Sequence, residues 1–159
     1  GLTLAAIPDR DITAQICHDA VTQNGMAIEF VPAQFLNATL CHIAMRQNHR
    51  AIEVVPHEYI DDTICRHYFA LRQASLLPAK MFTPALCELA IDEYGISLEE
   101  IPFACRSEAL CLQAVHKSVN NIYAIPARMF SNTFCRKLLN IHADVLSKLP
   151  EGFQSRWVV

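Results

Sequence analysis

Six of the seven cysteines in this 159-residue chain recur at nearly constant spacing. They are separated by 24, 24, 22, 24 and 24 residues, and they are Cys17, Cys41, Cys65, Cys87, Cys111 and Cys135. A series of prolines keeps the same period: Pro8, Pro32, Pro56, Pro78, Pro102, Pro126 and Pro150. Self-similarity with a period of about 20 to 50 residues indicates a protein built of stacked structural repeats. This spacing constrains the architecture more than any local motif does.

Aligned on the cysteines, the chain reads as six repeats preceded by half of one. The half repeat is 1–12, the repeats are 13–36, 37–60, 61–82, 83–106, 107–130 and 131–154, and residues 155–159, with Trp157, form a C-terminal tail or cap. We expect a single repeat domain over 1–159. The chain opens inside a repeat and without Met, which indicates a piece of a longer protein.

Each repeat begins with a residue that can cap a helix. These residues are Thr13, Asn37, Asp61, Thr83, Ser107 and Ser131, whose side chains can accept hydrogen bonds from free amides in a helix's first turn. Apolar residues follow at helical spacing, such as Leu40, Cys41, Ala44 and Met45 in the second repeat. The pattern predicts an amphipathic helix of about ten residues in every repeat.

A shorter apolar element and a proline turn complete each repeat. In the first repeat these are Ala27 to Val31 and the turn from Pro32 to Phe35, and proline suits the first position of a helical turn. No run alternates with period two, so we expect no sheet. The fold class is therefore all-α, an α-helical solenoid of about six 24-residue repeats. Gly25 and Gly95 are expected to mark helix ends in a left-handed conformation.

The cysteine series is better explained by packing than by chemistry. Equivalent helices lie about 8–10 Å apart, too far for disulfides, and neighbouring Cys and His residues such as Cys17 and His18 point in different directions, which disfavours zinc. Six equivalent cysteines also leave none to act as a nucleophile. We expect all six to be core residues beside a hydrophobic staple, and Cys105 to be buried as well.

The third repeat departs from the others. It is two residues short, and Tyr68 replaces the small alanine found at positions 20, 44, 90 and 114. One interpretation is drift compensated by the deletion. The other is a kink that shapes a groove.

Basic and histidine side chains gather in the first three repeats. They form a candidate binding strip: His18, His42, Arg46, His49, Arg50, Arg66 and His67. The fourth repeat instead carries Glu88, Asp92, Glu93, Glu99 and Glu100. Such residues can simply be a solvated face. If the strip is functional, it binds an acidic partner surface or phosphate, with affinity that falls with salt and with rising pH.

Composition narrows the classes of partner and compartment. The net charge of −3 and the isoelectric point near 6.2 argue against nucleic-acid binding. No apolar run is long enough to enter a membrane. Unpaired thiols favour a reducing compartment, either the cytoplasm or the cytosol of a host cell that the protein has been translocated into.

The repeat resembles a known family. The first repeat carries the pattern best, through Thr13, Ile16, Cys17, Ala20, Val21, Asn24, Gly25, Ala27, Ile28, Val31 and Pro32. This frame is similar to an uncharacterised bacterial repeat family, a domain of unknown function that is common in secreted effectors. The likeness covers almost the whole chain and weakens in the third repeat. The repeat length and short second helix also resemble leucine-rich variant repeats, in architecture only.

The resemblance implies a scaffold and brings no catalytic residues. We expect a protein–protein interaction scaffold, part of a bacterial effector that binds a host protein, and not an enzyme. No catalytic, cofactor or metal residue is assigned. The alternative is a substrate-recognition segment of a larger enzyme whose catalytic domain lies outside this chain. The open half repeat, 1–12, makes self-association a further hypothesis.

Overall fold

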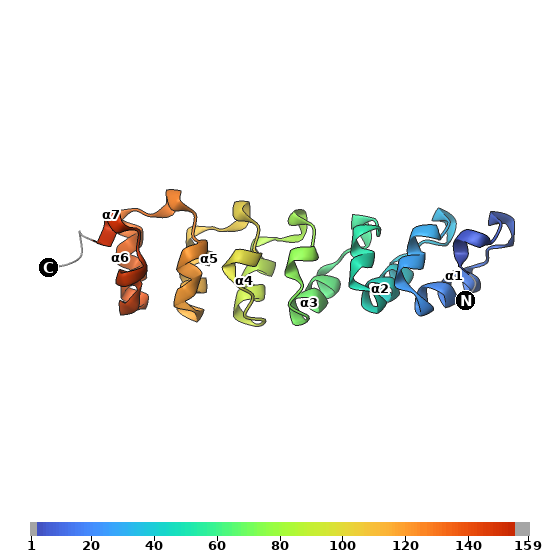
Figure 1. The fold of residues 1–159 in the computed structure, drawn as a ribbon, viewed down its shortest axis with the longest axis horizontal. Helices are drawn as coiled ribbons and strands as arrows, with labels where there is room; N and C mark the ends of the chain where they lie inside the picture. Colours follow the sequence, from blue (N-terminus) through green and yellow to red (C-terminus); the bar gives the residue numbers. More distant parts are fainter. Residues whose placement is uncertain (1–2, 155–159) are drawn as a thin grey trace. The chain divides into compact units, whose positions relative to one another are not determined.

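The computed structural model describes residues 3–154 of the chain (Figure 1). Every regular element in that range is an α-helix or a 3₁₀ helix, and the range contains no strand. The all-α prediction is therefore confirmed. The chain divides into two compact units, residues 1–81 and residues 82–159, which we call unit 1 and unit 2 and describe separately.

One α-helix follows each predicted cap. Unit 1 holds α1 (Ala14–Gln23), α2 (Ala38–Gln47) and α3 (Asp62–Ala70), and unit 2 holds α4 (Pro84–Asp92), α5 (Glu108–Lys117), α6 (Asn132–Ile141) and the short α7 (Glu151–Gln154). In α1 to α6 the cap side chain accepts a hydrogen bond from the amide three residues on. All six predicted caps are confirmed.

Short 3₁₀ helices fill the rest of each repeat. Unit 1 has η1 (Leu4–Ala6), η2 (Asp9–Asp11), η3 (Gly25–Phe30), η4 (Ala33–Phe35), η5 (His49–Glu53), η6 (His57–Tyr59), η7 (Ala74–Leu76) and η8 (Ala79–Met81). Unit 2 has η9 (Leu98–Glu100), η10 (Phe103–Cys105), η11 (Val119–Ala124), η12 (Ala127–Met129) and η13 (Ala143–Lys148). The recurring order of α-helix, 3₁₀ helix and proline turn is the repeat that the spacing predicts.

Neighbouring repeats within a unit pack side by side. In unit 1, α2 packs on α1 and on η3. In unit 2, α4, α5 and α6 lie next to one another in chain order (Figure 1). Within each unit, neighbouring repeats thus bury their apolar faces against one another, as expected for stacked repeats.

The core contains the cysteine series. Cys17, Cys41, Cys65, Cys87, Cys111 and Cys135 are all buried, and all seven cysteines are free thiols. The predicted role in packing is confirmed. The prediction for Cys105 is wrong, because the last residue of each proline turn lies at the margin of the core. Phe35, Tyr59, Met81, Cys105, Met129 and Phe153 are all half-buried.

The α-helices end in two different ways, and only one of them was predicted. Gly95, after α4, has a φ of 60° and takes the expected left-handed conformation. Asn24, after α1, is extended instead, with φ −145° and ψ 107°. Its side chain accepts a hydrogen bond from the Met26 amide at 3.1 Å and so begins the next 3₁₀ helix. The left-handed prediction is therefore wrong at Asn24–Gly25.

The glycine at position 25 is explained by a close backbone approach. A Cβ atom there would clash with the carbonyl oxygen of Ala44 and lie 2.9 Å from the Gln47 Oε1. The Gly25 amide donates to that same Oε1 at 2.6 Å, and the Gln47 Nε2 donates to the Gln23 carbonyl at 3.1 Å. A neutral amide side chain from the second repeat thus joins α1 and η3 of the first.

The third repeat accommodates its tyrosine by burying it. Tyr68 is fully buried, and its hydroxyl donates to the His49 carbonyl at 2.6 Å. The helix α3 then ends with Arg72 in the left-handed conformation, at φ 58°. Two closing bonds, from the Arg72 amide to Phe69 and from the Gln73 amide to Tyr68, form the arrangement known as a Schellman motif. The proposed kink stays a prediction.

Unit 2 joins its repeats with a buried amide and an arginine. The side chain of Asn121 accepts from the Leu98 amide at 2.9 Å and donates to the Ala114 carbonyl at 2.8 Å. Arg106 stands where the other repeats place an apolar residue, and it donates to the carbonyls of Ile101, Ala124 and Glu99 at 2.9, 2.7 and 3.0 Å. The predicted cap role of Trp157 lies outside the described residues.

Candidate functional site

The structure brings three residues of the predicted strip together. Arg46 is on α2, His49 opens η5 and His67 is on α3, so they come from the second and third repeats. The ring centroids of His49 and His67 are 5.8 Å apart, and both rings pack on Tyr68 at 5.8 and 6.0 Å. We call Arg46, His49, His67 and Tyr68 the histidine cluster.

The tyrosine that distinguishes the third repeat supports this cluster. Its hydroxyl bond to the His49 carbonyl fixes η5 against α3, and its ring lies edge-on to both imidazoles. Burial raises the pKa of the Tyr68 hydroxyl well above its usual range. It therefore stays protonated and continues to donate this bond at any physiological pH.

The imidazole of His67 is the perturbed group in the cluster. Burial lowers its pKa, and the positive charges of Arg46 and His49 lower it further. Its Nε2 atom is buried and has no hydrogen-bond partner in the described protein. A neutral His67 at pH 7 leaves Arg46 as the cluster's permanent charge, and an anion brought close would favour protonation of the imidazole.

The other four strip residues lie elsewhere in unit 1. His18 is exposed beside Asp19, with 3.6 Å between Nδ1 and Oδ1, and the Arg50 Nε is 3.5 Å from the Glu53 Oε1. Arg66 is exposed on α3. These placements leave the idea of one continuous basic strip as a prediction.

His42 is tied to the start of the next helix. Its Nε2 lies 3.3 Å from the Oδ2 of Asp61, the carboxylate whose other oxygen caps α3 at 3.0 Å from the Ile64 amide. The His42–Asp61 alignment does not form a hydrogen bond, so the contact gains strength only when the imidazole is charged. We read His42 as part of the joint between repeats.

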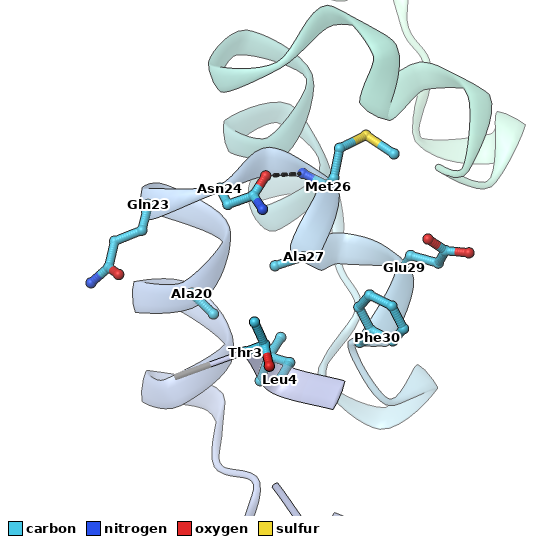
Figure 2. Close-up of a pocket in the computed structure, with 9 residues that line it drawn as sticks. All are labelled: Thr3, Leu4, Ala20, Gln23, Asn24, Met26, Ala27, Glu29 and Phe30. Atoms are coloured by element: carbon cyan, nitrogen blue, oxygen red, sulfur yellow. Dashed lines mark hydrogen bonds between the residues drawn. The ribbon is translucent and has the colours of Figure 1, made fainter. Parts of the chain in front are cut away.

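A cavity of about 320 Å³ opens at the first repeat and takes no residue from the strip. Figure 2 shows Ala20 and Ala27 on one side of it, Thr3 and Leu4 on another, and the Asn24 side chain already bonded to the Met26 amide. Ligand sites combine apolar walls with a few converging polar groups. Thr3, Gln23 and Glu29 also line the cavity, but its lining shows no charge pair and no ring contact like those of the histidine cluster, so we do not take it as the leading site.

The cysteine thiols do not fit a reactive site. Burial raises the pKa of Cys41, Cys65, Cys87 and Cys111 to about 11, whereas reactive cysteines have lowered pKa values. Within residues 3–154, no three His, Cys, Asp or Glu side chains are grouped to hold a metal ion. The described helices also include none long and apolar enough to cross a bilayer.

Sequence reasoning missed a second group of side chains. Phe103 and Tyr123 in unit 2 are exposed aromatic residues with cationic side chains over their rings. The sequence feature that could have indicated this group is Arg106, the one charged residue at the position before the caps, which is apolar in the other repeats. Its hydrogen-bond partners come from two repeats, so their identity could not be read from one repeat.

Comparisons with protein-family models, with curated proteins and with solved structures found no match to this chain.

Proposed function

We propose that this chain is a protein–protein interaction scaffold whose repeats stack as an α-helical solenoid, and that the histidine cluster contacts an acidic surface of a protein partner. One observation carries the proposal. The imidazoles of His49 and His67, from two adjacent repeats, lie with their ring centroids 5.8 Å apart, and the charge of Arg46 acts on His67. Stacking that aligns outward residues of successive repeats creates such surfaces.

The local charge favours an acidic partner. No Asp or Glu occurs between Glu29 and Glu53, a stretch that contains all of α2 and most of η5. Arg46 is charged at every physiological pH, and protonation of His67 adds charge as the pH falls. An acidic surface is the chemistry that this arrangement recognises best.

The wider biological setting is part of the same proposal. Seven free thiols support a reducing compartment. The resemblance described above implies an effector that acts on a host protein in the host cytosol. The histidine cluster is defined by contacts within unit 1 and does not depend on the partner's identity or on the setting.

The test is affinity capture with the whole chain, followed by measurement on the identified protein. We expect an acidic partner whose binding weakens with salt and strengthens as the pH falls below about 6.5. Arg46→Ala should weaken binding by about five- to tenfold, the effect of losing one important interface residue. The combined Arg46, Arg50 and Arg66 alanine variant should weaken it further.

A charge-matched control separates the cluster from general electrostatics. Arg10→Ala removes one exposed charge elsewhere in unit 1, where the Arg10 side chain is 85% exposed, and it should leave affinity unchanged. Circular dichroism shows whether each variant is folded. Equal losses in Arg46→Ala and Arg10→Ala, or no loss in the combined variant, would remove the cluster from the proposal.

A further inference from the structure

Unit 2 presents two exposed aromatic side chains, which come from consecutive repeats. Phe103 is 53% exposed and Tyr123 is 70% exposed, and they are the large apolar side chains exposed within the described part of this unit. Isolated exposed aromatics are common. In this unit, Arg106 contacts the Phe103 ring and also donates to the carbonyl of Ala124, the residue that follows Tyr123 in the chain.

The arginine between them is held in place. Its three nitrogens donate to three backbone carbonyls, and its guanidinium carbon lies 5.5 Å from the Phe103 ring centroid. A side chain fixed in this way loses little entropy when a partner binds over it. Arg106 therefore supports the Phe103 ring beside the backbone of the next repeat.

Two further cations complete the surface. The guanidinium of Arg128 lies 5.3 Å from the Phe103 centroid, and the Lys148 Nζ lies 5.2 Å from the Tyr123 centroid and 3.3 Å from its hydroxyl. Within the described part of unit 2, no ion pair joins Arg128 or Lys148 to a carboxylate. Their charges are available to a partner.

From these contacts we infer that Phe103, Tyr123, Arg128 and Lys148, supported by Arg106, form a docking surface for an acidic protein segment. Carboxylates of the segment pair with Arg128 and Lys148, while its apolar side chains pack against the exposed parts of the rings. Aromatic and arginine residues dominate binding energy at protein interfaces, and the paired charges fix the register. The inference rests on the proposed function and gives unit 2 its own partner chemistry.

The same geometry disfavours a nucleic acid. Bases bind by stacking on free aromatic faces, but two guanidinium groups already approach the Phe103 ring.

The experiment selects short random peptides displayed on phage against the whole chain at low salt. We expect enriched peptides with Asp or Glu on both sides of an apolar residue. In fluorescence anisotropy with the leading peptide, Phe103→Ala and Arg128→Ala should each weaken binding about tenfold. Arg128→Lys should retain part of the affinity because it keeps the charge and loses the planar contact.

Matched variants make every outcome decisive. Arg10→Ala, which removes an exposed charge outside both proposed surfaces, should leave peptide binding unchanged, and circular dichroism should show all variants folded. Enriched peptides without acidic residues, or affinities insensitive to Phe103→Ala and Arg128→Ala, would overturn the inference. So would tighter binding of single-stranded DNA or RNA through the same residues.

The outcome also separates this inference from the proposed function. Acidic peptides lost in Arg46→Ala but retained in Phe103→Ala would leave the histidine cluster standing and eliminate the unit 2 surface. Peptides lost in Phe103→Ala alone would support the surface even if the capture experiment on the histidine cluster fails.

Discussion

Adjacent repeats are joined by different contacts in the two units. The first joint of unit 1 and the joints of unit 2 use different side chains. In unit 1 a neutral amide, Gln47, bridges α1 and η3 where the backbone passes closely at Gly25. In unit 2 the equivalent of Gln47 is Lys117, which lies 2.9 Å from the Asp92 carboxylate, and Asn121 and Arg106 add further bonds. The joint is therefore variable while the helix cap and the buried cysteine are constant.

This difference predicts where each unit is vulnerable. The joint in unit 1 depends on the close backbone approach at Gly25, and the joints in unit 2 depend on hydrogen bonds from Asn121 and Arg106. The ion pair of Lys117 with Asp92 lies at the surface, where such pairs contribute little. Mutations at the close approach of Gly25, at the hydrogen bonds of Asn121 and Arg106, or in the shared core should therefore cause losses of stability that differ in size and in the unit they affect.

The largest effect is expected from Asn121→Ala. The change leaves the Leu98 amide without its buried partner and removes one of the two hydrogen bonds to the Ala114 carbonyl, which keeps the bond from the Ser118 amide. The loss should be about 2–4 kcal/mol, since an unsatisfied buried group costs about 1–3 kcal/mol and a lost hydrogen bond about 1 kcal/mol. Urea unfolding measures the total, and hydrogen exchange followed by mass spectrometry locates it. Asn120→Ala is the matched control, because Asn120 is exposed. A similar loss in both variants would show that the buried amide does not hold the joint.

The corresponding change in unit 1 is Gly25→Ala. The new methyl group would collide with the Ala44 carbonyl and with Gln47, and such overpacking costs about 1–3 kcal/mol. Increased hydrogen exchange should appear in peptides from α1 and α2. Gly152→Ala is the control, since a Cβ there meets nothing within 4 Å. If Gly25→Ala were as harmless as the control, the close approach would not be a constraint.

Arg106→Leu replaces the charged residue before the α5 cap with an apolar residue of the kind found at this position in the first repeats. It removes three bonds to carbonyls and restores the residue type found at Leu36, so we expect a net loss of about 1–2 kcal/mol. Arg106→Lys should lose a similar amount, because one ammonium group cannot replace a planar fork. A stabilised Arg106→Leu variant would mean that the arginine was kept for binding alone.

The shared core should respond equally in both units. Cys41→Ala and Cys111→Ala each empty a fully buried position, and each should cost about 1 kcal/mol, a typical value for a single core substitution. Thermal unfolding of the two variants compares them directly. Cys105→Ala, at a half-buried position, should cost less. A clear difference between Cys41→Ala and Cys111→Ala would argue against equivalent repeats.

The smallest effect is a loss of stability in acid that belongs to unit 1. The pKa of His67 in the folded chain is lowered from its ordinary value of 6.5 by burial, Arg46 and His49, so the unfolded chain binds the proton more readily. Stability from the neutral imidazole is complete above pH 6.5 and declines as the pH falls below it. His67→Gln should reduce this slope in urea unfolding at several pH values. An unchanged slope would assign the acid sensitivity to other groups.

The repeat itself could be predicted because its signals are local. A cap such as Asn37 bonds three residues ahead, and a cysteine such as Cys41 is buried by the apolar stripe of its own helix. The joints could not be predicted in the same way. Gly25 meets Ala44, and Arg106 meets Ala124, through packing between repeats, and no single repeat contains both partners.

The candidate sites show the same limit. The sequence selected Arg46, His49 and His67 by residue type, but the approach of the two imidazoles depends on how α3 packs beside η5 through Tyr68. Phe103 and Tyr123 were missed because their cations come from later repeats, Arg128 and Lys148. The surface chemistry of a repeat protein therefore depends on contacts between adjacent repeats. These contacts can be predicted only when two repeats are considered together.

The hydrogen bonds of Gln47 also have a mechanical consequence. They connect residues 22 and 24 positions apart in sequence, so pulling on the ends of unit 1 loads a contact between adjacent repeats and not one that spans the unit. We expect such a chain to lengthen under force in small steps. Each step would release one repeat, about 80 Å of extended chain at about 3.4 Å per residue, and would leave the neighbouring cap and core in place.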